Sequence, residues 1–168
     1  INQEELFYMI KICITLKSHL AEYLNGKYFS RDQECVCLPD KLDLYHTVWN
    51  LLEKVPVNCK PNLEGNLCLG LPDRRQGKDP AIYNYLGQRS IQIITLRVEA
   101  LFFGELRSRL DIGKNIHGRR YQDIVYEFKC EYMIDSITDD ALLKDFYRWR
   151  EKIRQRDKRK YLKKTHKK

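Results

Sequence analysis

The sequence predicts an all-α protein, a bundle of about five helices with one long loop and a basic C-terminal helix. Apolar residues recur at helical spacing through most of the chain. The loop, residues 56–80, contains four of the five prolines, and a loop of this length is often functional or mobile. Within it, only residues 67–71 could pair as a short strand. With 168 residues, the chain suits one domain with a real core. Its expected sub-regions are a helical core at 1–112 and a basic helical hairpin with a frayed tail at 114–168.

Two helices are expected before the loop. Asn2 and Glu5 form a capping box at the start of the first helix, and Gly26 ends it. The apolar residues between these signals have helical spacing: Leu6, Ile10, Cys13, Leu16, Leu20, Tyr23 and Leu24. The second helix is expected to begin around residues 38–40 and to end at Pro56, because proline cannot continue a helix. Its apolar face consists of Leu42, Tyr45, Val48, Trp49 and Leu52.

The third predicted helix begins at Asp79 and Pro80, which suit a helix cap and first turn. Its pattern runs from residue 81 to about residue 111. Residues 91–98 are β-branched enough to resemble a strand. We favour a helix because no turn signal separates them from the residues that follow. Apolar residues on more than one side of this helix indicate the central element of the bundle.

Two further helices follow a turn at residues 111–118. The fourth begins at Tyr121 and ends near Asp135. Thr138 then caps a fifth helix with two acidic residues in its first turn, where negative charge suits the helix dipole. The predicted buried face of the fifth helix consists of Leu142, Phe146, Trp149 and Ile153.

The positive charge of the chain is concentrated in its last 25 residues. Residues 144–168 contain thirteen Lys or Arg and three acids, a local balance of +10, so the total of +8 leaves −2 for residues 1–143. A field this localised attracts polyanions, most often the phosphates of nucleic acid. We therefore expect a nucleic-acid-binding accessory or regulatory protein, with DNA favoured over RNA.

On a helical wheel, the fifth helix separates an apolar side from a cationic side. The residues expected to contact nucleic acid lie within about 80° of one another. They are Lys144, Arg148, Lys152, Gln155 and Arg159. Arg119 and Arg120, at the start of the fourth helix, could extend this surface. The last two helices resemble the spacing of a helix-turn-helix, but a plain antiparallel hairpin with a solvated cationic face explains the same pattern.

The six cysteines are interpreted as reduced thiols. Cys13 and Cys130 fall within helical patterns, where a free cysteine behaves as a small hydrophobe. The remaining four are Cys35, Cys37, Cys59 and Cys68. Structural zinc sites favour pairs separated by two to four residues, and these pairs are separated by one and by eight. Neither a metal nor a cofactor is therefore expected.

The sequence contains no motif with a catalytic mechanism, so we do not expect an enzyme. His117, beside the two arginines at 119–120, is the one histidine considered for a phosphate or catalytic role. The main alternative function is a helical protein-interaction module, including a homodimer, whose basic tail meets an acidic partner surface. A polybasic tail can contact anionic lipids, but no insertion or lipidation signal would make membrane association stable. Without a signal peptide or transmembrane pattern, the expected location is cytoplasmic.

Overall fold

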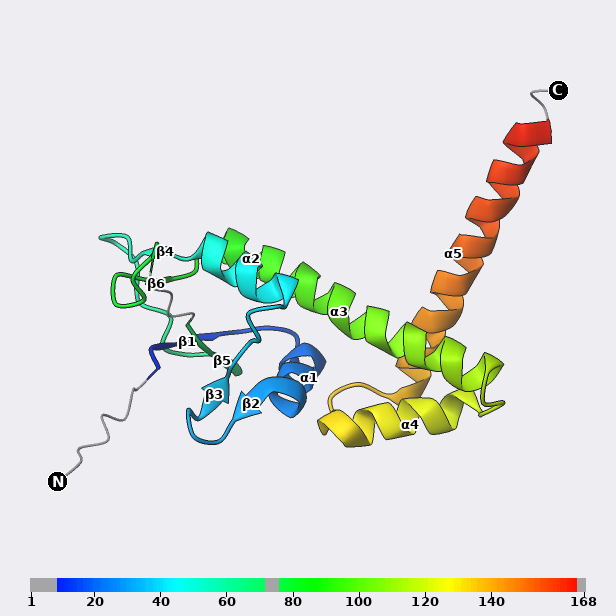
Figure 1. Ribbon diagram of the computed structural model, residues 1–168, viewed down its shortest axis with the longest axis horizontal. Coiled ribbons are helices and arrows are strands. Elements are labelled where there is room, and N and C mark those ends of the chain that lie inside the picture. Colours follow the sequence, from blue (N-terminus) through cyan, green and yellow to red (C-terminus); the bar gives the residue numbers. More distant parts are fainter. Residues whose placement is uncertain (1–8, 72–75, 166–168) are drawn as a thin grey trace.

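Short strands and helices together form a mixed α/β fold in residues 9–71 and 76–165, the part of the chain that the computed structural model describes (Figure 1). The first half contains β1 (Lys11–Ile14), α1 (Ser18–Tyr28), β2 (Phe29–Ser30), β3 (Cys35–Val36), α2 (Asp43–Leu51), β4 (Glu53–Lys54), β5 (Leu67–Gly70) and β6 (Tyr83–Tyr85). Three longer helices follow: α3 (Gln88–Asn115), α4 (Tyr121–Tyr132) and α5 (Asp139–Thr165). The prediction of an all-α bundle is therefore wrong, because two β-sheets accompany the five helices of these residues.

The larger sheet has four strands in the order β1–β5–β3–β2. β5 pairs antiparallel with β1 and parallel with β3, and β3 pairs antiparallel with β2. Alternate residues of β1 and β5 are buried, as expected for strands with one face on a core. These core-facing residues are Ile12, Ile14, Leu67 and Leu69. The smaller sheet pairs β4 with β6.

The first predicted helix is wrong over residues 9–17, which form β1 and its connection to α1. Lys-Ile-Cys-Ile alternates with period two, but its apolar residues also fit a helical spacing shared with α1. The antiparallel pairing with β5 makes this segment a strand and not a helix. The capping box of Asn2 and Glu5 lies outside the described residues.

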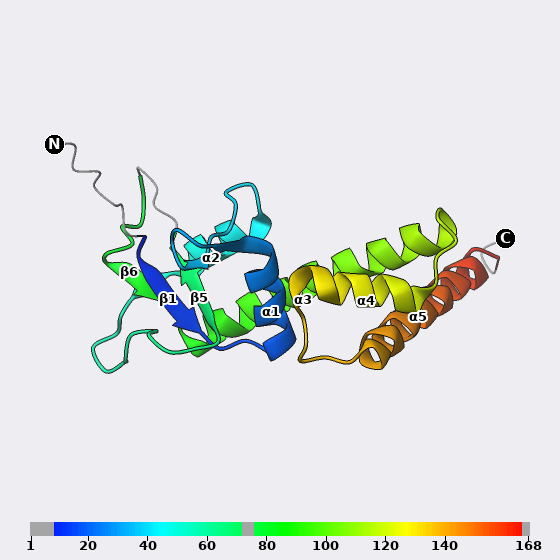
Figure 2. The same cartoon turned by 90° about the horizontal axis from the view of Figure 1, so that it is seen from below.

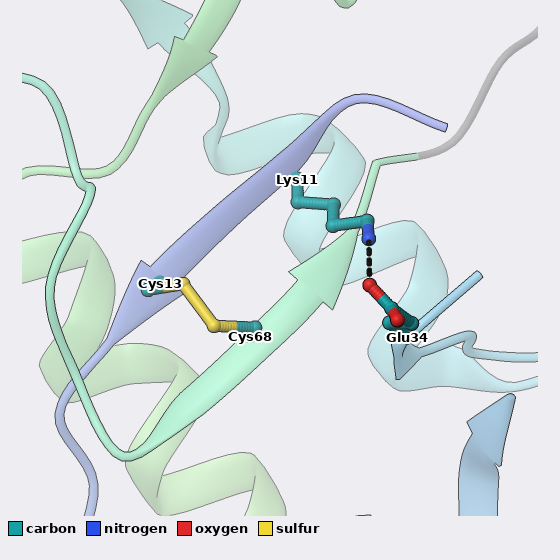
Figure 3. The surroundings of a disulfide bond; sticks show 4 residues. All are labelled: Lys11, Cys13, Glu34 and Cys68. Atoms are coloured by element: carbon teal, nitrogen blue, oxygen red, sulfur yellow. Dashed lines mark ion pairs between the residues drawn. A yellow bond between two sulfur atoms is a disulfide. The ribbon is translucent and has the colours of Figure 1, made fainter. Parts of the chain in front are cut away.

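A disulfide joins Cys13 of β1 to Cys68 of β5 (Figure 3). The two residues are direct partners in the antiparallel register, and their Cα atoms are 4.1 Å apart. The interpretation of all six cysteines as reduced thiols is therefore wrong for this pair. Because the cross-link joins residues 55 positions apart, chain entropy alone assigns it about 4 kcal/mol of stabilisation. Cys68 is also unavailable to a four-thiolate zinc site.

α3 is the long axis to which both ends of the fold attach (Figure 2). The larger sheet and α2 lie toward its start, whereas α4 and α5 lie toward its end. A buried stripe that recurs every four residues runs along it: Ile94, Val98, Phe102, Leu106 and Leu110. The predicted helix over residues 91–98 is confirmed. None of the helices described is both long and apolar enough to cross a lipid bilayer.

The segment before α3 differs from the prediction. The Asp79 carboxylate accepts a hydrogen bond from the backbone N–H of Ala81 (2.9 Å), which closes a turn instead of starting a helix. The chain then forms β6 before α3 begins at Gln88. The predicted 56–80 loop contains β5, the short strand that its sequence allowed. α2 is also shorter than predicted, beginning at Asp43 and ending before Leu52.

Candidate nucleic-acid interface

The first half of α5 is fixed to the body by apolar and aromatic packing. Thr138 caps the helix as predicted, since its Oγ1 accepts the backbone N–H of Ala141 (3.3 Å). Leu142 and Phe146 are fully buried, and the Phe146 ring stacks on Trp149 with centroids 5.9 Å apart. Trp149 is half-buried against the same core. The predicted inner face is thus confirmed for Leu142, Phe146 and Trp149, whereas Ile153 is only partly buried. The side of α5 that faces solvent lies opposite these residues.

Two arginines at this interface are held by protein partners. Arg107 of α3 donates to the Asp145 carboxylate (2.9 Å), and its guanidinium lies 4.9 Å from the centre of the Trp149 ring. Arg150 of α5 donates to the hydroxyl of Tyr121 (2.8 Å). These contacts combine ion pairing, stacking and hydrogen bonding, so both arginines contribute to packing.

Glu22 of α1 fixes the turn that leads into α5. Its Oε2 accepts hydrogen bonds from the backbone N–H of Asp135 (3.0 Å), from the backbone N–H of Ser136 (3.1 Å) and from the Ser136 hydroxyl (2.8 Å). One helical turn later, Gly26 allows α1 to approach α4, because a Cβ there would collide with the backbone of Tyr132. α1 therefore determines where α5 begins.

The opposite side of α5 carries an exposed surface that we call the cationic face, made up of Lys144, Arg148, Lys152 and Arg159. Within the described part of the chain, none of the four has an ion-pair or hydrogen-bond partner. At 1.5 Å per residue, the face is about 22 Å long. Gln155 is exposed on the same side, where its Nε2 donates to Glu151 (3.2 Å). The structure thus brings these five predicted residues to one surface.

Beyond Ile153, α5 leaves the body of the protein. Each side chain from residue 154 to residue 159 is exposed. Figure 1 shows the C-terminal half of α5 standing away from the other elements. This projecting half is accessible to a large partner from several directions.

The two arginines at the start of α4 have different environments. Arg119 forms a two-pronged ion pair with Glu127 (Nη1 to Oε2, 2.8 Å), which lowers the pKa of that carboxyl. Its charge is therefore already compensated. Arg120 is exposed and has no such partner among the described residues. Because Tyr121 packs against Phe146 (ring centroids 5.2 Å apart), Arg120 lies near the N-terminal third of α5.

Three further cations near this surface were not predicted. The Nζ of Lys114, at the end of α3, lies 5.8 Å from the centre of the Tyr121 ring. Arg156 and Lys158 are exposed on the projecting half of α5. The excess of positive charge in residues 144–168 could have identified Arg156 and Lys158 from the sequence. Lys114 could not be found without the contact between the end of α3 and the start of α4.

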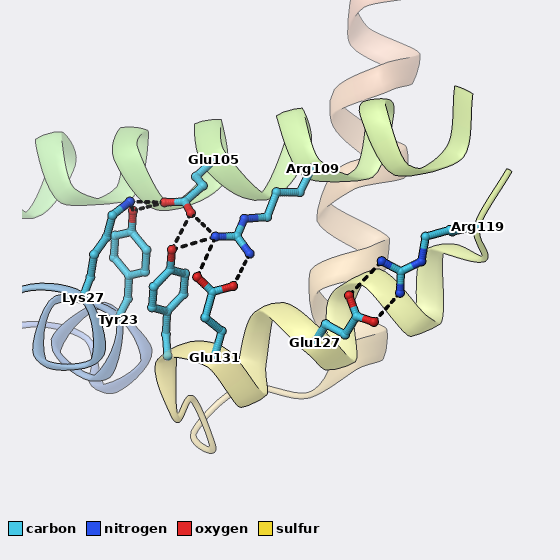
Figure 4. Close-up of polar contacts among 8 residues, drawn as sticks. Tyr23, Lys27, Glu105, Arg109, Arg119, Glu127 and Glu131 are labelled. Atoms are coloured by element: carbon cyan, nitrogen blue, oxygen red, sulfur yellow. Dashed lines mark hydrogen bonds and ion pairs between the residues drawn. The ribbon is translucent and has the colours of Figure 1, made fainter. Parts of the chain in front are cut away.

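A second charge cluster joins α1, α3 and α4 (Figure 4). This Glu105 cluster consists of Tyr23, Lys27, Glu105, Arg109, Glu131 and Tyr132. The Glu105 carboxylate accepts hydrogen bonds from both tyrosine hydroxyls (2.6 Å each) and from Arg109 (2.7 Å), and it pairs with Lys27. Burial acts to raise the pKa of Glu105, but these hydrogen bonds outweigh it and lower the pKa to about 2. Arg109 also pairs with Glu131, so the charges of the cluster balance internally.

His117 borders a hollow of about 240 Å³ near the end of α3. Arg109 and Arg119 line the same hollow, and both are engaged by carboxylates. The structure therefore adds no support for a phosphate-binding or catalytic role of His117.

Comparison of the chain with protein-family models, curated proteins and solved structures found no match.

Proposed function

We propose that the chain binds nucleic acid through the cationic face of α5, mainly by phosphate contacts, with double-stranded DNA favoured over RNA. The supporting observation is the contrast between the unpaired cations of this face and the neighbouring arginines 107, 119 and 150, which have protein partners. Unpaired cations on a rigid helix can replace the counterions condensed on a nucleic acid, and release of those counterions favours binding.

The shape of α5 supports the same proposal. The major groove of DNA, about 12 Å wide, admits an α-helix, and residues 154–159 in the projecting half of α5 are exposed. The first turn of α5 is less suitable for contact with phosphates, because it carries the acidic residues Asp139 and Asp140. Asp139 also pairs with Lys129 (2.7 Å). Contacts are therefore expected from Lys144 onward. The cations of this side are expected to contact mainly phosphates, and Gln155 can bond to the edge of an adenine, so sequence preference should be modest.

The proposal is tested by fluorescence anisotropy of a labelled DNA duplex of about 25 base pairs, titrated with the full chain at about 50 and 200 mM salt. Affinity should fall steeply at the higher salt concentration. Replacing two cations of the face, Arg148→Ala with Lys152→Ala, should weaken binding and reduce the salt slope by about 1.8, or about 0.9 per phosphate contact.

The matched control is Arg31→Ala with Lys41→Ala. Both residues are exposed and, within the described chain, have no ion-pair or hydrogen-bond partner. The control removes the same charge from the sheet end and should leave binding nearly unchanged. Equal losses in the two double variants would contradict the proposal. Absence of duplex binding at about 50 mM salt would also contradict it and would redirect attention to a protein partner. A parallel titration with duplex RNA tests the preference for DNA.

A further inference from the structure

Three sulfur atoms converge on the outer face of the larger sheet. The parallel register pairs Val36 with Leu69, and both side chains are buried in the core. Because side chains alternate along a strand, Cys35 and Cys37 point toward the opposite face. The Sγ atoms of Cys35 and Cys37 are 3.8 Å apart, and Cys37 Sγ is also 3.8 Å from the Sδ of Met9.

Gly70 provides the space between these sulfur atoms. A Cβ at this position would lie 3.0 Å from Cys35 Sγ and still closer to Met9 Sδ. The Sγ of Cys35 and the Sδ of Met9 therefore both lie next to this position, so these two sulfur atoms are also close to each other. The neighbouring outer-face position of β5 is Cys68, whose sulfur is committed to the disulfide (Figure 3).

We infer that Cys35, Cys37 and Met9 form a binding site for a soft monovalent metal ion, Cu(I). Thiolate and thioether sulfurs are the ligands that select Cu(I). In a trigonal site with metal–sulfur bonds of about 2.3 Å, neighbouring sulfurs are about 4 Å apart. The two measured spacings of 3.8 Å are close to that requirement.

The donor set does not suit zinc. Structural zinc sites are tetrahedral, with four nitrogen, oxygen or thiolate ligands. Among the residues that the structure describes, no group of three or more His, Cys, Asp or Glu could hold a metal ion. Two thiols and one thioether therefore provide a soft, three-coordinate site.

Binding of Cu(I) is balanced in charge and in protons. Cu(I) would bond to the two cysteine sulfurs with release of their protons and accept a lone pair from Met9, and no electron is transferred. The filled site would carry one negative charge. Lys11, 4.0 Å from Glu34, provides a cation on the same face (Figure 3).

The test uses the full chain with Cys59→Ser and Cys130→Ser, because this background leaves Cys35 and Cys37 as the free thiols. Ascorbate keeps copper as Cu(I), and the chelator bicinchoninate competes for it. One Cu(I) per chain should be retained in this background. Either Cys35→Ser or Cys37→Ser should abolish retention, and Met9→Leu should weaken it by at least about tenfold.

Gly70→Ala provides a variant that removes no donor atom. Its methyl group should displace Met9 and weaken Cu(I) binding, while circular dichroism shows whether the fold is kept. Mass spectrometry of the unreduced protein checks that the Cys13–Cys68 disulfide remains closed. Failure of the background protein to retain Cu(I), retention after loss of Cys35 or Cys37, or preferential retention of Zn(II) when both ions are offered would overturn the inference.

Discussion

The Glu105 cluster and the cationic face of α5 are both rich in charge, but they use it differently. In the cluster, Lys27 and Arg109 are paired with carboxylates and bonded to tyrosines, and together these residues hold α1, α3 and α4. On the cationic face, the cations point into solvent without protein partners in the described chain. The paired charges of the Glu105 cluster should stabilise the fold, whereas the unpaired charges of the cationic face are available to a polyanion.

The largest effect on stability within this comparison is expected from Glu105→Gln. The change replaces the carboxylate that Lys27 and Arg109 share by a neutral amide, which should lower the free energy of unfolding by about 2–3 kcal/mol. Chemical denaturation measures this change. Glu151→Gln, an exposed position on α5, is the control and should change stability by less than about 0.5 kcal/mol. Similar losses in the two variants would remove the distinction between the two regions.

The contribution of Glu105 should also depend on pH. Its pKa falls from 4.5 to about 2 on folding. A carboxyl with a lowered folded-state pKa stabilises the fold fully above its unfolded pKa, and this stabilisation is lost as the pH falls toward the folded value. The stability difference between the original chain and Glu105→Gln should therefore be constant above about pH 5 and shrink between about pH 4.5 and pH 2. Urea denaturation across this range measures it, and a difference that stays constant down to pH 2 would contradict the account.

A smaller loss of stability is expected from Glu22→Gln, because this change weakens the acceptor of three hydrogen bonds at the turn before α5. The free energy of unfolding should fall by about 1–2 kcal/mol. Hydrogen exchange should become faster at the amides of Asp135 and Ser136. If exchange at these amides does not change, Glu22 does not hold the turn.

The smallest effect on stability is expected from alanine at single positions of the cationic face. Each change should alter the free energy of unfolding by less than about 0.5 kcal/mol, because no contact with the body is lost. Thermal or chemical denaturation of Lys144→Ala and Arg148→Ala checks this. A loss above about 1 kcal/mol would assign these residues to packing instead of to binding.

The sequence was sufficient to predict α5 and its two faces, because a helix with one apolar side has a local period that can be counted. The same reasoning failed for β1, where Ile12 and Ile14 fit both a strand and a helix. Their partner strand lies some 55 residues away. β2 and β3 have two residues each, too few for any periodic pattern.

The Glu105 cluster was not predicted for a similar reason. Tyr23, Glu105 and Tyr132 are far apart in the sequence and meet only when α1, α3 and α4 pack together. The sequence also could not separate Arg119 from Arg120. Only the structure shows that Glu127 compensates the first and not the second.

The most direct test of the central claim compares salt slopes of DNA binding for two fourfold variants with the same net charge. One removes the whole cationic face: Lys144→Ala, Arg148→Ala, Lys152→Ala and Arg159→Ala. The other removes four exposed cations of the sheet end: Arg31→Ala, Lys41→Ala, Lys60→Ala and Arg89→Ala. The account predicts that the slope of log affinity against log salt becomes shallower by about 3.6 in the first variant and stays nearly constant in the second. Equal changes in both slopes would show that net charge, and not the face of α5, determines binding.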